Sequence, residues 1–457
     1  MATQAEQMAA GLTMSNFAQA TDLQKRIWFT LGALIIFRLL SYVPLPGIDP
    51  IAMADVFQRN QGGVLDLFNS FSGGALQRMS IIAVGVMPYI TASIVVQLST
   101  SLSPSMNTLK KEGESGRKKL NQYTRYLTVL LTAIYGFSVA SALLASHTAT
   151  GQSVAYQGGI LFYISTITAL VGGTMFLMWL GEQITSRGIG NGISLIIMAG
   201  IVSQLPGTLG TMFESVRTGS GQYSALSVIF ISILAIVLIA FICFMEQAQR
   251  RLLIQYPKRQ TMRGVQQEKS FLPLKINTAN VIPPIFASSL LAFPITLLGW
   301  FGKSATGENK ASDIILTIVN LMQPGAWLHA LLYALLIIFF CFFYSAITFN
   351  PEETADNLKR HGGFIPGIRP GKNTADYLDY VLVRITVIGA AYLTLICLVP
   401  EILLGEGYSS LRRLGGTGLL IVVNVTIDTV TQIQGHLLAH QYGDLLKKAK
   451  LKGGRLR

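Results

Sequence analysis

The stretch "SIIAVGVMPYITASIVVQLS", residues 80–99, is long and apolar enough to sit in a lipid bilayer. Gly85 and Pro88 interrupt it, and Thr91, Ser93 and Gln97 place polar groups along one side. A plain membrane anchor needs neither feature. The stretch therefore predicts a membrane helix whose interruptions have a purpose.

The composition predicts a polytopic membrane protein. Of 457 residues, 51% are hydrophobic and only 12% are charged, whereas a soluble domain has about 25% charged residues. A bilayer core about 30 Å thick requires roughly 20 apolar residues for each helical crossing. Ten runs approach this length: 27–45, 75–101, 124–145, 160–180, 188–206, 225–245, 279–300, 326–347, 381–400 and 417–436.

Basic residues predict the orientation, because Lys and Arg accumulate in cytoplasmic loops. With the N-terminus inside, 26 of the 35 basic residues are cytoplasmic, 6 lie on the far side and 3 lie within or at the ends of spans. Both termini are therefore predicted to be cytoplasmic. The first 24 residues show no cleavable signal peptide.

The ten spans divide into five and five, and any repeat between the halves then has inverted topology. The second span contains "VMPYITAS" and the seventh contains "VIPPIFASS", so Pro88 and Pro283 occupy similar places in the two halves. The predicted fold is an all-α polytopic membrane protein with two pseudo-symmetric inverted five-helix halves. The alternative is coincidence, since proline is common in transmembrane helices.

Residues 61–76, "QGGVLDLFNSFSGGAL", are too short and polar to cross the membrane. They resemble a re-entrant half-helix, which must be buried in protein or line a wet cavity because irregular backbone cannot face lipid. Gly62–Gly63 and Gly73–Gly74 flank it as candidate hinges. A surface helix on the far side is the alternative.

Two long loops lie on the cytoplasmic side. Residues 246–278 have β-favouring runs on either side of a basic turn, which predicts a hairpin. Residues 348–380 contain "NPEE" at 350–353, which is typical of a helix start, and then break at "GGFIPGIRPG".

The sequence has no phosphate-binding GxxxxGK[ST] loop, no metal-spaced His or Cys cluster and no serine or cysteine triad. Cys243, Cys341 and Cys397 lie in apolar spans without paired spacing and are interpreted as packing residues. The chain is therefore predicted not to be an enzyme and to need no cofactor.

Long ordered stretches resemble the bacterial SecY family, the central subunits of the protein translocation channel. They include "FNSFSGGAL", "MPYITASIVVQL", "GTMFLMWLGEQITSRGIGNGIS", "LPLKIN" and "PGIRPG". The resemblance implies a clamshell of two five-helix halves around an hourglass pore, with a lateral opening between the second and seventh spans.

The resemblance also implies a ring of apolar side chains at the constriction of the pore. The matching residues are Val86, Ile90, Ile193, Ile197, Ile285 and Ile421. Val86 departs from the isoleucine usual in the family, which is expected to widen the ring slightly. Such a constriction excludes water and ions by dewetting.

Segment 61–74 corresponds to the family's plug, which fills the outer funnel at rest. Its expected residues are Gly63, Val64, Leu65, Asp66, Leu67, Phe68, Asn69 and Phe71, with Asp66 and Asn69 facing the wet funnel. The expected lateral gate consists of Pro88, Thr91, Ser93, Gln97, Asn280, Pro283, Ser288 and Ser289. The two prolines are expected to bend the gate helices and the polar side chains to weaken the seam, unless the hydroxyls only satisfy backbone carbonyls.

The resemblance implies partners and a location. The motor ATPase SecA or a translating ribosome is expected to dock through Lys258, Arg259, Arg263 and Arg369, although Gly264 stands where relatives often have a second arginine. SecE, SecG, signal peptides, preproteins and membrane lipids are further expected partners, with an accessory insertase as another candidate. The expected location is the bacterial inner membrane.

The predicted organisation is a cytoplasmic tail at 1–24, an N-terminal half at 25–206, an external linker at 207–224, a C-terminal half at 225–436 and a basic cytoplasmic tail at 437–457. The main alternative function is an ion-coupled secondary transporter, which shares inverted repeats and broken helices. Only Arg38 and Asp428 stand clearly in or near a span, so the buried ionisable cluster of a transporter is missing. A membrane insertase scaffold would lack the plug.

Overall fold

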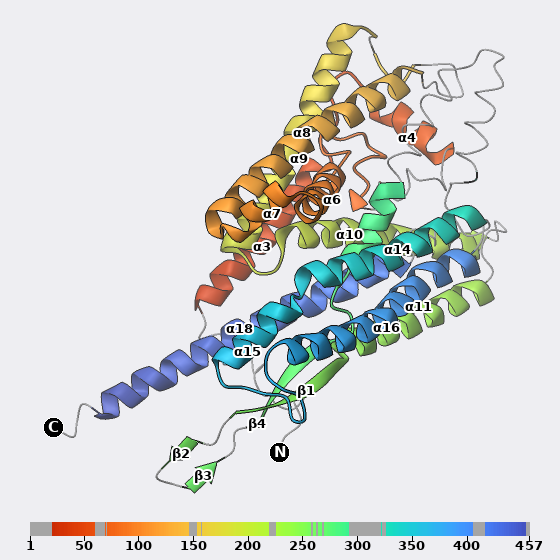
Figure 1. Ribbon diagram of the computed structural model, residues 1–457. Coiled ribbons are helices and arrows are strands. Elements are labelled where there is room, and N and C mark those ends of the chain that lie inside the picture. The colour runs from red at the N-terminus through yellow and green to blue at the C-terminus, as the bar shows by residue number, and fades with distance from the viewer. Residues whose placement is uncertain are drawn as a thin grey trace.

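The computed structural model describes residues 21–59, 69, 71–145, 153–156, 158–218, 225–256, 259–261, 264–266, 269–291, 321, 326–404 and 416–453. These ranges are mainly helical (Figure 1), as predicted. In them, seven helices are long and apolar enough to cross a membrane. They are α8 (Glu114–Ala145), α9 (Ile160–Arg187), α10 (Gly192–Thr218), α11 (Ala225–Gln247), α14 (Trp327–Thr348), α16 (Lys372–Leu404) and α18 (Gly416–Gly453).

The three other predicted spans are also helical, over shorter described lengths. The first is α3 (Thr21–Leu40), the second contains α6 (Met87–Leu102) and the seventh contains a helix over Ile282–Leu291. The prediction of a helix over 75–101 was wrong in its first part, because 75–86 form successive turns. Met79 and Gly85 adopt positive φ there, a conformation that a continuing helix excludes.

The expectation that Pro88 and Pro283 bend the gate helices was also wrong. Pro88 stands in the first turn of α6, and Pro283 is the second residue of the Ile282–Leu291 helix. Proline suits the first turn because its missing N–H would have no helical partner there. Both prolines therefore start their helices, and they do so at equivalent places.

The helices form two groups, as Figure 1 shows. Helices α3, α6, α8 and α9 lie in the upper group, while α11, α14 and α16 lie in the lower one. Helices α10 and α18 run between the groups and pack against each other. The largest hydrophobic core draws buried residues from both groups.

Shorter elements flank the bundle. Helix α4 (Pro50–Arg59) precedes the turns, and α7 (Pro104–Lys111) joins α6 to α8. The predicted hairpin is present: β1 (Gln249–Gln255) pairs antiparallel with β4 (Lys269–Lys275), and β2 (Arg259–Thr261) pairs with β3 (Gly264–Gln266) at its tip.

The predicted helix in the second long loop is also present as α15 (Pro351–Arg360). The side chain of Asn350 caps it by accepting hydrogen bonds from the backbone N–H groups of Glu352 and Glu353. A capping residue of this kind stabilises a helix start by about 1 kcal/mol. The following residues, 361–371, are irregular.

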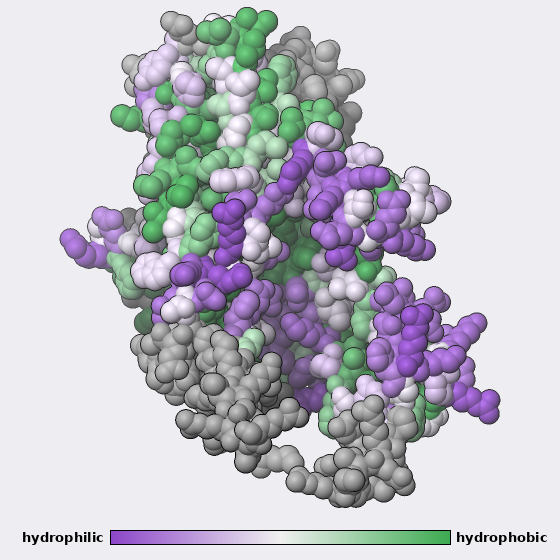
Figure 2. Space-filling view, turned by 90° about the vertical axis from the view of Figure 1, so that its left-hand side faces the viewer, coloured by the Kyte–Doolittle hydropathy of each residue, from purple (hydrophilic) through white to green (hydrophobic). Residues whose placement is uncertain are grey.

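Figure 2 shows the side of the molecule that carries α7, α15 and the end of α18. Hydrophobic residues cover much of its upper part. Hydrophilic residues gather across its middle and lower right, around a hollow. This face therefore differs from the apolar sides of the bundle.

Candidate pore, gate and docking surface

The residues expected to form the pore ring gather in one hydrophobic cluster. Val86, Ile90, Ile197 and Ile421 are at most 6% exposed and belong to it. The remaining two, Ile193 and Ile285, are partly buried and pack against it. Val86 is the N-cap residue of α6, and Ile193 and Ile197, four residues apart on α10, lie on one helix face. The expected ring residues therefore all lie in or against the core that both groups of helices share.

The end of the expected plug lies against this cluster. Phe71 belongs to it and is 9% exposed. A Cβ atom on Gly200 of α10 would lie 2.5 Å from the carbonyl oxygen of Phe71, so only glycine permits this approach. Gly63, Val64, Leu65, Asp66, Leu67 and Phe68 lie outside the described residues.

Asn69 does not face a wet funnel, contrary to expectation. It is 1% exposed, and its Oδ1 accepts a hydrogen bond of 2.9 Å from the backbone N–H of Gln77. Its carbonyl oxygen accepts a 2.6 Å hydrogen bond from Gln204 Nε2 on α10. Asn69 thus satisfies buried backbone groups where the plug segment joins the turns.

Arg38 and Arg78 lie beside the end of the expected plug segment, near Gly73 and Tyr42. Arg38 Nη1 donates a hydrogen bond of 2.6 Å to the carbonyl oxygen of Gly73. The guanidinium carbons of Arg38 and Arg78 lie 5.0 and 4.1 Å from the ring centre of Tyr42. Cation–π contacts of this kind stabilise by about 0.5–2 kcal/mol. The plug junction is therefore attached to the end of α3.

The polar side chains of the expected gate mostly bond within their own helices. Thr91 Oγ1 donates to the carbonyl oxygen of Met87, and Ser288 and Ser289 both donate to that of Ile285. Gln97 Nε2 donates to Ser93 Oγ. Across the seam, Ser289 Oγ donates a long hydrogen bond of 3.9 Å to Met87 Sδ. The hydroxyls therefore mainly satisfy carbonyls of their own helices.

The two long loops form one unit, which the sequence did not predict. The backbones of Gln255, at the end of β1, and Phe364 exchange two hydrogen bonds of 2.9 and 3.0 Å. Ile365 also packs in a small core with Leu252 and Leu274 of the hairpin. This pairing fixes the loop that carries Arg369.

Arg369 is exposed, and its carbonyl oxygen accepts a hydrogen bond from Thr374 Oγ1. For Arg259 the structure describes the backbone, in β2. Lys258 and Arg263 lie outside the described residues. The structure therefore places one of the four expected docking side chains, at an exposed position on a supported loop.

Comparison with known proteins decides the family. The SecY family model matches residues 80–430. The protein translocase subunit SecY of Vibrio cholerae serotype O1 is 49% identical over 434 residues, which is 95% of this chain and 96% of the relative. The chain belongs to the SecY family. The SecY proteins of Rickettsia typhi and Escherichia coli K12 are 51% and 48% identical, and cover 96% and 94% of this chain and 99% and 96% of their own lengths.

Solved structures share the fold of this chain. A structure described as a protein conducting channel has a TM-score of 0.64 at 18% identity, and covers 91% of this chain and 92% of its own. Sec61 in a canine ribosome-channel complex from the endoplasmic reticulum has a TM-score of 0.61 at 17% identity with the same coverage. At these identities the likeness concerns the fold.

These matches confirm the predicted SecY family, the all-α membrane fold and the role of a protein-conducting channel subunit. The chain is a multi-pass membrane protein and not an enzyme. Nothing in the comparisons supports an ion-coupled transporter. The assignment of individual residues to ring, plug, gate and docking surface stays a prediction.

Sequence reasoning missed one polar group in this SecY chain. Glu246 stands at the end of α11, one residue beyond the predicted span 225–245, and is 5% exposed. A carboxylate that directly follows an uncharged apolar run is the signal that could have indicated it. Its hydrogen-bond partners are Asn277 and Tyr392.

Proposed function

We propose that this SecY-family chain passes unfolded secretory polypeptides across the membrane and releases transmembrane segments sideways into lipid. The chain forms the pore, and energy comes from SecA or a translating ribosome. SecE and SecG complete the complex, signal peptides and preproteins enter it, and lipids surround it, with an accessory insertase as a further candidate partner. The proposed site is the bacterial inner membrane, with both termini cytoplasmic.

One observation carries the proposal: the six expected ring residues, from α6 and its N-cap, α10, α18 and the Ile282–Leu291 helix, belong to or pack against the same hydrophobic core as Phe71. A narrow apolar constriction excludes water and ions because it offers no replacement for their hydrogen bonds. Helices of two groups contribute to it, so separation of the groups would widen it around a polypeptide. Segment 61–74 is proposed to close it as the plug.

The lateral gate is proposed between α6 and the Ile282–Leu291 helix. The polar contact of Ser289 with Met87 across this seam is weak, since a thioether sulfur is a poor acceptor. Interhelical hydrogen bonds in membranes average about 0.6 kcal/mol even between better partners. A seam of this kind supports reversible opening.

The docking surface is proposed on the unit of the two long loops. Its backbone pairing and small core give Arg369 a supported position, and the planar fork of arginine suits carboxylate or phosphate partners. Lys258, Arg259 and Arg263 are proposed as additional contacts. We propose that these basic side chains contact carboxylate groups of SecA or phosphate groups of ribosomal RNA.

Photocrosslinking of a stalled secretory precursor tests the proposed path. A photoreactive probe in the precursor should label Ile90, Ile193, Ile285 and Ile421 in vesicles that contain the assembled complex. Leu335, which is 57% exposed on α14, provides the comparison position. Labelling of Leu335 without labelling of the four isoleucines would contradict the pore.

A further inference from the structure

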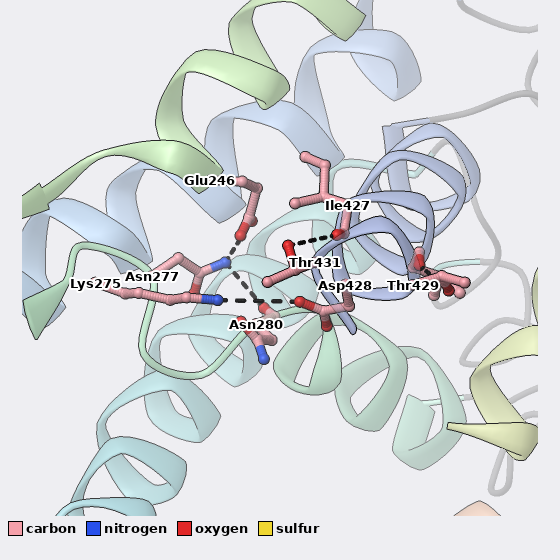
Figure 3. Close-up of polar contacts among 9 residues, drawn as sticks. Glu246, Lys275, Asn277, Asn280, Ile427, Asp428, Thr429 and Thr431 are labelled. Atoms are coloured by element: carbon pink, nitrogen blue, oxygen red, sulfur yellow. Dashed lines mark hydrogen bonds and ion pairs between the residues drawn. The ribbon is translucent and has the colours of Figure 1, made fainter. Parts of the chain in front are cut away.

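A buried carboxyl group lies near the start of the Ile282–Leu291 helix. Glu246, in the last turn of α11, accepts hydrogen bonds from Asn277 Nδ2 at 2.7 Å and from the hydroxyl of Tyr392 at 3.4 Å. Figure 3 shows Glu246 and Asn277 pointing toward each other. A carboxyl group removed from water is costly unless it is hydrogen-bonded. The partners of Glu246 therefore hold defined positions.

Asn277 extends this contact to the next turn. Its Nδ2 also donates to the carbonyl oxygen of Asn280 at 3.1 Å, and a side-chain amide has two hydrogens to donate. Asn280 has a φ of +53°, a left-handed conformation that asparagine adopts more readily than most residues. The helix begins two residues later, at Ile282. One amide group thus connects α11 to the turn that starts this helix.

A second set of contacts holds the same turn to α14 and α16. Thr278 Oγ1 lies 3.1 Å from Ser345 Oγ, which lies 3.0 Å from Thr386 Oγ1. A Cβ atom on Gly389 of α16 would lie 2.9 Å from the carbonyl oxygen of Ile276, so the backbones approach closely. Residues 276–280 are therefore fixed to the lower group of helices from two sides.

We propose that Glu246 is a positioning residue of the lateral gate. Through Asn277 it fixes the turn at Asn280, and this turn is the pivot about which the Ile282–Leu291 helix moves when the seam opens. The pivot is held by several hydrogen bonds, whereas in the described part of the seam the polar contact is the weak one between Ser289 and Met87. The proposal rests on the gate proposed above.

Closure of the seam then depends on the pivot. A fixed turn presents the helix to α6 in one orientation, so closing the seam requires little further ordering. When the turn loses its contact with Glu246, the helix samples more orientations and the closed population falls. The seam opens more often although none of its own residues has changed.

A neighbouring ion pair provides a contrast. Lys275 Nζ lies 3.9 Å from Asp428 Oδ1 of α18, with side chains 55% and 45% exposed (Figure 3). An exposed pair at this distance contributes little, at most about 1 kcal/mol. Asp428→Asn is therefore a matched control, because it removes a carboxylate beside the same turn without touching the pivot.

The test measures the seam directly. Met87→Cys and Ser289→Cys are combined in a chain whose native Cys243, Cys341 and Cys397 are replaced by alanine, and the full complex is treated with a thiol crosslinker. Glu246→Ala should reduce the crosslinking yield several-fold and raise ion conductance. Glu246→Gln should behave like the parent, since its amide oxygen still accepts from Asn277. Asp428→Asn should also behave like the parent.

A second variant and a stability control keep the result decisive. Asn277→Ala removes the donor of the Asn277–Glu246 hydrogen bond and should therefore have the same effect as Glu246→Ala. If one of the two variants fails to fold, the other still tests the proposal. Ile396→Val trims a fully buried side chain of α16 and lowers stability by about 0.5–1.5 kcal/mol without touching the pivot. Unchanged crosslinking in folded Glu246→Ala, or an equal loss in Ile396→Val, would overturn the proposal.

Failure of the gate itself is distinguishable. In the parent, a stalled precursor should lower crosslinking between positions 87 and 289. If the parent does not respond to the precursor, the lateral gate is wrong. If the parent responds and the Glu246 and Asn277 variants match it, the gate stands and the positioning role of Glu246 is rejected.

Discussion

The carbonyl oxygen of Gly73 accepts a 2.6 Å hydrogen bond from Arg38 Nη1, which attaches the end of the plug segment to α3. A hydrogen bond to a charged donor contributes about 1.5–3 kcal/mol. The contact is therefore strong enough to bias the resting position of the proposed plug.

Arg38→Met should loosen this attachment and raise the ion conductance of the resting channel several-fold in planar bilayers. Arg38→Lys should give an intermediate value, because lysine keeps the charge but lacks the planar fork. Leu39→Ala, at a neighbouring side chain that is 65% exposed, is the control. Equal conductance of Arg38→Met and Leu39→Ala would contradict the role of Arg38.

Gly200 gives a steric test of the same junction. Gly200→Ala would place a methyl group 2.5 Å from the carbonyl oxygen of Phe71 and 3.2 Å from the backbone nitrogen of Gly73, so the plug segment must shift. We expect higher resting conductance and lower thermal stability. Gly210→Ala, also on α10 with open space around it, should leave conductance unchanged and gain up to about 1 kcal/mol in helix propensity.

The result for Gly200→Ala has a clear failure condition. If its resting conductance equals that of Gly210→Ala while both proteins are folded, the close approach of α10 to the plug junction does not contribute to the seal.

Much of the fold could be predicted because the signals are local. Uncharged runs indicated the long helices, β-favouring runs on either side of a basic turn indicated the β1–β4 hairpin, and Pro351 with the acidic residues after it indicated the start of α15. Each of these elements depends on residues close together in the sequence, so it could be predicted without knowledge of tertiary contacts.

The remaining features depend on contacts between distant residues. An apolar run does not distinguish a helix from buried turns, so the break over 75–86 was missed. Because Asn69 is polar, we expected it to face water, yet its side-chain oxygen accepts a hydrogen bond from the backbone N–H of Gln77. Pairing of Gln255 with Phe364 joins residues more than one hundred positions apart, and no local pattern specifies it.

An ion pair between α8 and α9 should contribute measurably to stability. One nitrogen of Arg125, Nη2, lies 2.8 and 2.6 Å from the two carboxylate oxygens of Glu182. The side chains are 45% and 35% exposed, so solvent screening limits the coupling to about 0.2–1 kcal/mol. A double-mutant cycle with both alanine variants, followed by thermal unfolding in mild detergent, measures this coupling.

Helix α8 also contains the comparison pair. Lys118 Nζ lies 3.5 Å from Glu114 Oε1, and the two side chains are 76% and 88% exposed. Their coupling should be smaller than that of Arg125 and Glu182. Equal coupling energies for the two pairs would show that the shorter distances and lower exposure of the Arg125–Glu182 pair have no effect.

Arg369→Glu should abolish SecA-driven transport into proteoliposomes and leave the fold intact. The side chain is exposed on a loop held by the Gln255–Phe364 pairing, so the substitution breaks no buried contact and places a negative charge where the proposed partner presents its own. Arg369→Lys should retain partial transport, because one charge remains but the bidentate fork is lost.

Arg360→Glu, an equal charge change at an exposed position in the last turn of α15, is the matched control and should transport normally. SecA binding and preprotein import are measured for all three, together with thermal unfolding. Normal import by Arg369→Glu would reject the docking role, and an equal loss in Arg360→Glu would assign the effect to the net charge of this face instead of Arg369.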